Sequence, residues 1–67
     1  MYYELYELKN AVMDEPTDEN INALADWLQV YGRLFWRKKY FDLDDFRLYP
    51  LYEKVDGEIE ITGWELD

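Results

Sequence analysis

Cysteine, histidine and serine are all absent from the 67-residue sequence. Without them the chain has no disulfide, no His/Cys zinc site, no thiol or imidazole catalysis and no Ser-His-Asp triad. The three glycines, at positions 32, 57 and 63, do not form a glycine-rich phosphate loop. We therefore expect a protein that is not an enzyme and that uses no cofactor.

Positive charge is also scarce. Sixteen acidic residues against seven basic ones give a net charge of −9. Such a charge repels phosphates, which argues against direct binding to nucleic acid or to an anionic membrane. No segment approaches the roughly 20 apolar residues of a membrane span, and the acidic N-terminal segment lacks the basic region of a signal peptide. Together with the lack of cysteine, these features predict a cytoplasmic protein.

Hydrophobic residues make up 49 % of the chain and aromatic residues 19 %. This content predicts a folded single domain over residues 1–67 and not a disordered chain. A domain this short buries only about 60 % of its unfolded surface, so its stability must come from close packing, a partner subunit or a target. The residues that we expect to be buried are Leu5, Leu24, Leu28 and Ile61.

The first half of the sequence predicts two antiparallel helices, over residues 2–15 and 18–31. Pro16 ends the first helix, because a residue before proline avoids helical geometry. Thr17 is a suitable N-cap for the second helix, and Gly32 is expected to end it in the left-handed conformation. The apolar residues expected on the inner arcs are Tyr2, Leu5, Tyr6, Leu8, Val12 and Met13, then Ile21, Leu24, Trp27, Leu28 and Tyr31.

The second half predicts strands over residues 33–40, 46–55 and 58–62, the last extended through Trp64 and Leu66. An acid-rich turn over residues 42–45 separates the first two strands. The complete prediction is an α+β fold, in which a helical hairpin is followed by a small antiparallel β-sheet of two to three strands. The apolar stripes of the helices are expected to cover one face of that sheet.

Asp56-Gly57 is a strong hairpin-turn signal, but it leaves two registers open. A two-residue loop pairs Lys54 with Ile59, whereas a three-residue loop pairs Lys54 with Glu58. We favour the three-residue loop, because it places opposite charges across from each other. Pro50 predicts that its strand lies at an edge of the sheet or contains a bulge.

The acid-rich turn over residues 42–45 also suggests a calcium loop. Glu53 falls at the twelfth position, where such a loop has its bidentate glutamate. However, Arg47 occupies the position that requires glycine, and Phe46 occupies a ligand position. We therefore expect a solvated turn and no metal site.

The acidic residues of the two helices are expected to form a continuous anionic face. Asp18 and Asp26 lie about 12 Å apart along the helix axis. Fixed carboxylates on a rigid scaffold can occupy a groove that normally binds nucleic-acid phosphates. The alternative is that these acids cap helices and maintain solubility. The candidate partner-binding acids are Glu4, Glu7, Asp14, Glu15, Asp18, Glu19 and Asp26.

Five of the seven basic residues lie between positions 33 and 47. One interpretation is that they neutralise the nearby acids at 42–45, and another is that they bind the acidic helices of a second copy. Trp36 and Tyr40 lie beside these bases and are the aromatic candidates for partner binding. Core packing is the alternative role for both rings. The basic residues are Arg33, Arg37, Lys38, Lys39 and Arg47.

In size, acidic charge, aromatic content and missing catalytic residue types, the whole chain resembles small phage-encoded anti-defence proteins of the anti-CRISPR, anti-restriction and DNA-mimic type. The resemblance implies a nuclease inhibitor in the host cytoplasm, which binds a nuclease or DNA-binding protein and blocks its basic nucleic-acid site. The alternative hypothesis is a non-enzymatic protein-interaction module. In that case surface aromatics mediate a homodimer or larger homo-oligomer, and the acids serve solubility only.

Overall fold

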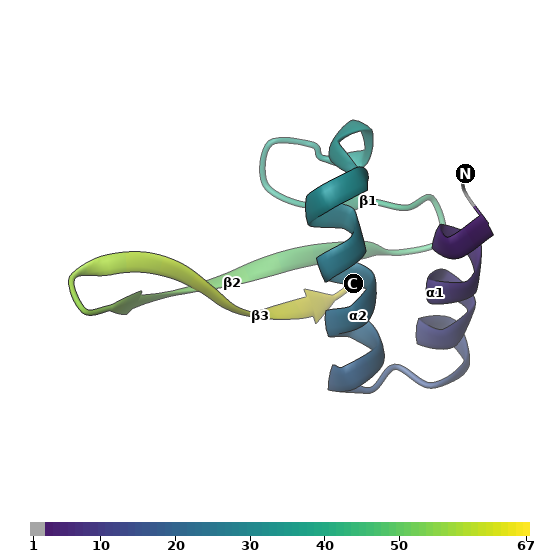
Figure 1. The fold of residues 1–67 in the computed structure, drawn as a ribbon, viewed down its shortest axis with the longest axis horizontal. Helices are drawn as coiled ribbons and strands as arrows, with labels where there is room; N and C mark the ends of the chain where they lie inside the picture. The colour runs from purple at the N-terminus through teal and green to yellow at the C-terminus, as the bar shows by residue number, and fades with distance from the viewer. Residues whose placement is uncertain (1–2) are drawn as a thin grey trace. The chain divides into compact units, whose positions relative to one another are not determined.

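The computed structural model describes residues 3–67, with two helices followed by a three-stranded antiparallel sheet (Figure 1). The predicted α+β arrangement is confirmed. The chain divides into a helical unit, Met1–Arg33, and a sheet unit, Leu34–Asp67. In chain order the elements are α1 (Tyr3–Asp14), α2 (Asp18–Tyr31), the 3-10 helix η1 (Arg33–Phe35), β1 (Phe41–Asp42), β2 (Arg47–Val55) and β3 (Glu58–Leu66).

Helix α1 ends just before Pro16, as predicted, and buries only a narrow stripe. Leu5 and Val12 are buried, whereas Tyr6 is 67 % exposed and Met13 is also exposed. The prediction that these two residues share the buried arc is therefore wrong. Each lies about 100° around the helix from a buried residue, Tyr6 from Leu5 and Met13 from Val12, and packing reaches only part of the apolar side. Tyr2, assigned to the same arc, lies outside the described residues.

Helix α2 starts where the capping pattern predicts. The Thr17 hydroxyl accepts a 3.2 Å hydrogen bond from the backbone N–H of Asn20. Leu24 and Leu28 are fully buried, as predicted. Tyr31 is 66 % exposed, which corrects its assignment to the buried arc. Its ring contacts the half-buried Trp27, with ring centroids 5.3 Å apart, so it packs along the helix surface instead.

Gly32 ends α2 in a conformation that differs from the prediction. Its φ is −98°, outside the left-handed region, and its N–H donates to the Leu28 carbonyl oxygen at 2.8 Å. A Cβ at this position would lie 2.8 Å from the Cα of Leu28. Glycine is therefore required here by the close approach of the preceding helical turn, and not by a positive φ.

The strand predicted over residues 33–40 does not form. Arg33–Phe35 is a 3-10 helix, and Trp36 joins the sheet only through an isolated bridge to Phe41. Lys38, which interrupts the alternating pattern, has a φ of +69° that a strand cannot contain. The Arg37 guanidinium donates to the Leu34 carbonyl oxygen at 2.7 Å and stabilises the non-extended backbone.

The predicted turn over residues 42–45 is confirmed. The Leu43 N–H donates to the Phe46 carbonyl oxygen at 3.0 Å. Asp44 has a φ of +66°, which aspartate tolerates better than most residues, and its N–H donates to Asp42 Oδ1 at 3.2 Å. This local network reverses the chain between β1 and β2.

The β2–β3 hairpin has the two-residue loop, so the favoured three-residue loop is wrong. Val55 lies opposite Glu58, while Asp56 and Gly57 have φ values of +51° and +85°. Positive φ at both loop positions defines a type I′ turn, whose twist matches that of the paired strands. Turn geometry therefore outweighs the charge pairing that Lys54 would have made in the other register.

Pro50 satisfies both parts of its prediction. The short β1 pairs only with Arg47 and Leu48, so within residues 3–67 no third strand lies beside β2 at Pro50. The register between β2 and β3 also shifts between Leu51 and Tyr52. Proline is tolerated at this place because the missing N–H faces an unpaired edge or an irregularity of the ladder.

The buried residues of the sheet unit lie near β1, and the part of the β2–β3 hairpin from residue 51 to residue 62 is exposed. Phe41, Leu43 and Leu48 are buried, whereas every residue from 51 to 62 is exposed. Ile61 is 39 % exposed, so its predicted burial is wrong. The reason is that this part of the hairpin has only two strands and no third element beside it within the sheet unit (Figure 1).

Candidate functional site

The helical unit carries the seven acidic candidates predicted from the sequence, and all seven are exposed. No ion pair of the described part of the chain involves any of their carboxylates. The sequence up to residue 32 contains only one base, Lys9, whose ammonium lies 6.0 Å from the Tyr6 ring centroid. We call the seven residues the acidic helical surface: Glu4, Glu7, Asp14, Glu15, Asp18, Glu19 and Asp26.

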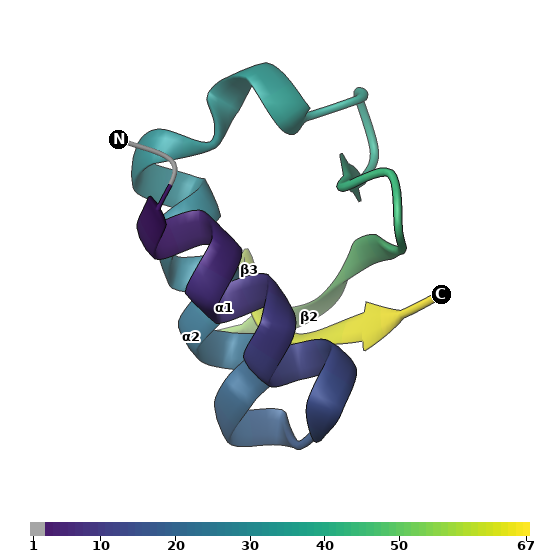
Figure 2. The ribbon, with the colours of Figure 1, turned by 90° about the vertical axis from the view of Figure 1, so that its right-hand side faces the viewer.

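A short, well-bonded link holds the two helices of this surface. The Asn20 side-chain amide donates to the carbonyl oxygens of Glu15 at 2.8 Å and Ala11 at 3.3 Å. Thr17 caps the start of α2 in the same link. Figure 2 shows α1 and α2 side by side, joined at this end. The carboxylates are therefore mounted on two helices whose connection is fixed by side-chain hydrogen bonds.

The acids differ in what they do for their own helices. Glu4 lies in the first turn of α1, and Asp18 and Glu19 lie in the first turn of α2, where the helix dipole favours negative charge. Asp14 is at the opposite, negative end of α1, where no base compensates it. Asp26 lies in the middle of α2, too far from either end to interact strongly with the helix dipole. Asp14 and Asp26 thus have no stabilising role that explains their charge.

The charge density of this surface can be compared with that of nucleic acid. Helix α2 has 14 residues, which corresponds to a length of about 21 Å. Seven acids and one base lie in the sequence up to residue 32. This amounts to roughly one net negative charge per 3.5 Å of helix length, close to the value for a single nucleic-acid strand and about half that of a duplex.

The two aromatic candidates, Trp36 and Tyr40, lie in the sheet unit and are half-buried. The Trp36 ring packs edge-on against Phe41, with centroids 4.9 Å apart, and Phe41 lies 5.7 Å from Trp64. Tyr40 lies 5.0 Å from Tyr49. Both candidates therefore pack within aromatic contacts of their own unit, which limits the ring surface open to a partner.

Among the clustered bases, Arg47 is tied to the aromatic residues. Its guanidinium carbon lies 5.4 Å from the Tyr40 ring centroid. A hydrogen bond with the Tyr49 side chain is the main cause that raises the pKa of Arg47, followed by electrostatic interactions with Tyr40, Tyr49 and Asp42. Among the acids of residues 42–45, Asp42 is the one that raises this pKa.

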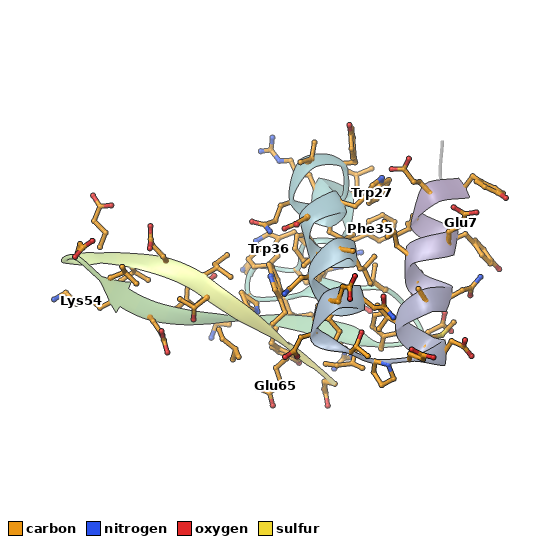
Figure 3. The ribbon with its side chains drawn as sticks, turned by 60° about the horizontal axis from the view of Figure 1, so that its bottom comes forward. Glu7, Trp27, Phe35, Trp36, Lys54 and Glu65 are labelled. Atoms are coloured by element: carbon orange, nitrogen blue, oxygen red, sulfur yellow. The ribbon has the colours of Figure 1, made fainter. Side chains whose placement is uncertain are left out.

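Sequence reasoning missed one exposed feature, the far part of the β2–β3 hairpin. Ile59 is 73 % exposed and Tyr52 is 56 % exposed. Lys54 extends from the same part of the hairpin (Figure 3). The alternating pattern of residues 58–62 predicts a half-buried strand. Alternation alone cannot reveal whether a third element covers the apolar side.

Two other kinds of site are absent from the described residues. In this part of the chain, no group of three or more metal-ligating residues could hold an ion. No helix over residues 3–67 has the length and apolar character that crossing a bilayer requires. Comparisons with protein-family models, with curated proteins and with solved structures gave no match.

Proposed function

We propose that the protein is a stoichiometric inhibitor that binds a nuclease or another nucleic-acid-binding protein. The acidic helical surface would occupy the basic groove of that target and exclude its nucleic acid. The observation that carries this proposal is a set of seven exposed carboxylates without ion-pair partners among the described residues, on two linked helices. Resemblance to small anti-defence proteins of the DNA-mimic type points in the same direction.

The position of Asp14 supports a role in binding more than one in solubility. A negative charge at a helix C-terminus is unfavourable by about 0.3–1 kcal/mol, and α1 has no base in its last turn. Solubility could be served by an acid anywhere on the exposed surface. A role in partner binding would explain why an acidic residue stands at a position where its charge opposes folding.

The charge density supports a target groove that accommodates one nucleic-acid strand. A net charge spacing of roughly 3.5 Å resembles that of a single strand, since a duplex carries one charge per about 1.7 Å. Binding would be steered by long-range attraction and would weaken with salt. The target class is therefore a protein with a basic channel for single-stranded nucleic acid, or for one strand of an opened duplex.

The test is an affinity pull-down from the source cell or its host, at low and high salt. The baits are the wild type, a Glu7→Gln/Asp26→Asn variant and a Glu65→Gln/Asp67→Asn control, which removes the same charge from the exposed C-terminal end of the sheet unit. We expect a nuclease or other nucleic-acid-binding protein that the control retains, and that high salt or the helix variant releases. Capture that is equal for both variants would contradict the proposed surface.

The competing hypothesis is homo-oligomerisation through surface aromatics. Light scattering coupled to size-exclusion chromatography distinguishes it, because apolar association persists or strengthens at high salt. An oligomer that persists at high salt and captures no other protein would contradict the inhibitor hypothesis and support the interaction module.

A further inference from the structure

The outer edge of β3 is open along the far part of the hairpin. The strand order is β1-β2-β3, so β3 pairs with β2 on one side only. Residues 58–62 are exposed. An edge strand offers a row of backbone donors and acceptors to an incoming strand, and proteins ordinarily block such an edge. Within the described residues, no other strand occupies this edge.

The register identifies which backbone groups are available. In a β-turn the residues on either side of the two-residue loop are hydrogen-bonded, and here these are Val55 and Glu58. Hydrogen-bonded and non-hydrogen-bonded pairs alternate along an antiparallel ladder. The Lys54–Ile59 and Tyr52–Ile61 pairs are therefore non-hydrogen-bonded. The N–H and C=O groups of Ile59 and Ile61 consequently point away from β2, toward the open edge.

The other open edge of the hairpin, that of β2, is blocked. Pro50 lacks a backbone N–H, and Lys54 places a charge on that strand. Both are recognised means of preventing strand addition at an edge. Residues 58–62 contain neither proline nor lysine, and their two charged residues, Glu58 and Glu60, are acidic, so they disfavour an acidic strand but not a basic one. The asymmetry between the two edges indicates that β3 is the edge left accessible.

The side chains at this edge define the chemistry of an occupant. On one face, Ile59 and Ile61 are exposed beside their cross-strand neighbour Tyr52. On the opposite face, Glu53 and Glu60 lie directly across from each other, and Glu58 is on the same face. Like charges directly opposite each other destabilise a hairpin. An incoming strand with basic residues on that face would relieve the repulsion.

We propose that the outer edge of β3 binds an extended segment of a partner protein in which basic and apolar residues alternate. The segment adds a fourth strand, with its backbone bonded to Ile59 and Ile61, its apolar side chains beside those two residues, and its bases beside Glu58 and Glu60. A second copy fits less well, because an antiparallel β3–β3 pair would bring the glutamates of both copies onto one face. This surface lies in the sheet unit and does not depend on the acidic helical surface.

The test uses the full chain and a fluorescent, N-acetylated seven-residue peptide of alternating lysine and valine. A peptide of the same composition, with four lysines followed by three valines, controls for simple charge attraction. Fluorescence anisotropy measures both dissociation constants, and we expect the alternating peptide to bind at least about tenfold more tightly. Binding of both peptides with equal affinity would overturn the proposal.

Two proline variants locate the edge that is used. Ile59→Pro removes an N–H from the β3 edge, and Lys54→Pro, its register partner, removes one from the β2 edge. We expect Ile59→Pro to weaken binding by about tenfold or more, and Lys54→Pro to leave it within about threefold. The reverse order would overturn the assignment to β3. Circular dichroism checks that both variants are folded.

Amide hydrogen exchange of the wild type gives an answer even if a variant does not fold. Bound peptide should slow exchange at Ile59 and Ile61 and leave Lys54 and Tyr52 unchanged. Binding without this protection would overturn the proposal, as would protection of Ile59 and Ile61 by dimerisation without peptide. Glu7→Gln/Asp26→Asn removes general charge attraction and should weaken both lysine-rich peptides alike. The preference for the alternating peptide should not change, so failure here is distinguishable from failure of the acidic helical surface.

Discussion

The Asn20 side chain of α2 donates a 2.8 Å hydrogen bond to the carbonyl oxygen of Glu15, just beyond the end of α1. A second bond from the same amide reaches Ala11 in the last turn of α1. The same two carbonyl oxygens also accept backbone N–H groups, that of Ala11 from Glu15 at 2.9 Å and that of Glu15 from Thr17 at 2.8 Å. The Asn20 amide therefore adds two bonds that tie the start of α2 to the end of α1 across Pro16.

Loss of this amide should destabilise the helical unit. We expect Asn20→Ala to lower the free energy of unfolding by about 0.5–1.5 kcal/mol, because it removes the side-chain hydrogen bonds that link the two helices. The control is Asn22→Ala, at an exposed position of α2, where alanine should be neutral or stabilising. Urea unfolding followed by circular dichroism gives both values. Equal effects would show that the inter-helix bonds contribute nothing measurable.

Truncation of the buried Leu28 should have a much larger effect. We expect Leu28→Ala to destabilise by about 2–5 kcal/mol, since it removes buried contacts and leaves a cavity. A chain of this size has little stability in reserve, so complete loss of the thermal transition is consistent with this range. Val30→Ala, on the exposed side of α2, is the control and should unfold at nearly the wild-type temperature. An unchanged melting temperature for Leu28→Ala would contradict the described packing of α2.

The two structurally constrained glycines should respond to alanine for different reasons. At Gly32 the added Cβ would lie 2.8 Å from the Leu28 Cα, so backbone must shift, and we expect a loss of about 1–3 kcal/mol. At Gly57 nothing lies within 4 Å of an added Cβ, but φ is +85°. Left-handed strain alone should destabilise Gly57→Ala by about 1–2 kcal/mol.

An asparagine substitution separates strain from crowding at the two glycines. Gly57→Asn should recover much of the stability lost in Gly57→Ala, because asparagine tolerates positive φ. Gly32→Asn should recover none of the loss at Gly32. Thermal unfolding of the four variants measures this pattern. Recovery at both sites would contradict the crowding that the structure describes at Gly32.

Removing the same charge from the two ends of α1 should change stability in opposite directions. Glu4→Gln loses a favourable interaction with the helix dipole, and Asp14→Asn removes an unfavourable one. We expect Glu4→Gln to destabilise and Asp14→Asn to stabilise, each by about 0.3–1 kcal/mol at low salt. Both differences should shrink in high salt. The measurement is urea unfolding at two ionic strengths, and a stabilised Asp14→Asn that captures less target would support a binding role for that residue.

Local chemistry accounts for the parts of the fold that the sequence predicts well. Thr17, Pro16 and the Asp56-Gly57 turn each act through bonds or dihedral angles within a few residues, and the sequence predicts the place of each correctly. The strand over residues 33–40 is predicted wrongly, because apolar alternation there is a weaker determinant than the residues that break it. Lys38, one of those residues, has a positive φ.

The remaining differences depend on packing that a local pattern does not contain. Ile61 has the alternation of a half-buried strand, yet β1 is too short to pair beside the far part of the hairpin. The acidic helical surface is predictable because exposure follows from charge. The open β3 edge is not, because it requires the strand order and the turn register.

The connectivity within each unit also has a kinetic consequence. Helix α1 contacts α2, the next helix in the chain, and each paired strand is joined to its neighbour by a short turn. The chain therefore closes only small loops as these contacts form, and the entropy lost on closure is low. Proteins dominated by such local contacts fold in microseconds to milliseconds. A freshly synthesised chain would spend little time with its hairpin unpaired, which limits the interval in which exposed strands can aggregate.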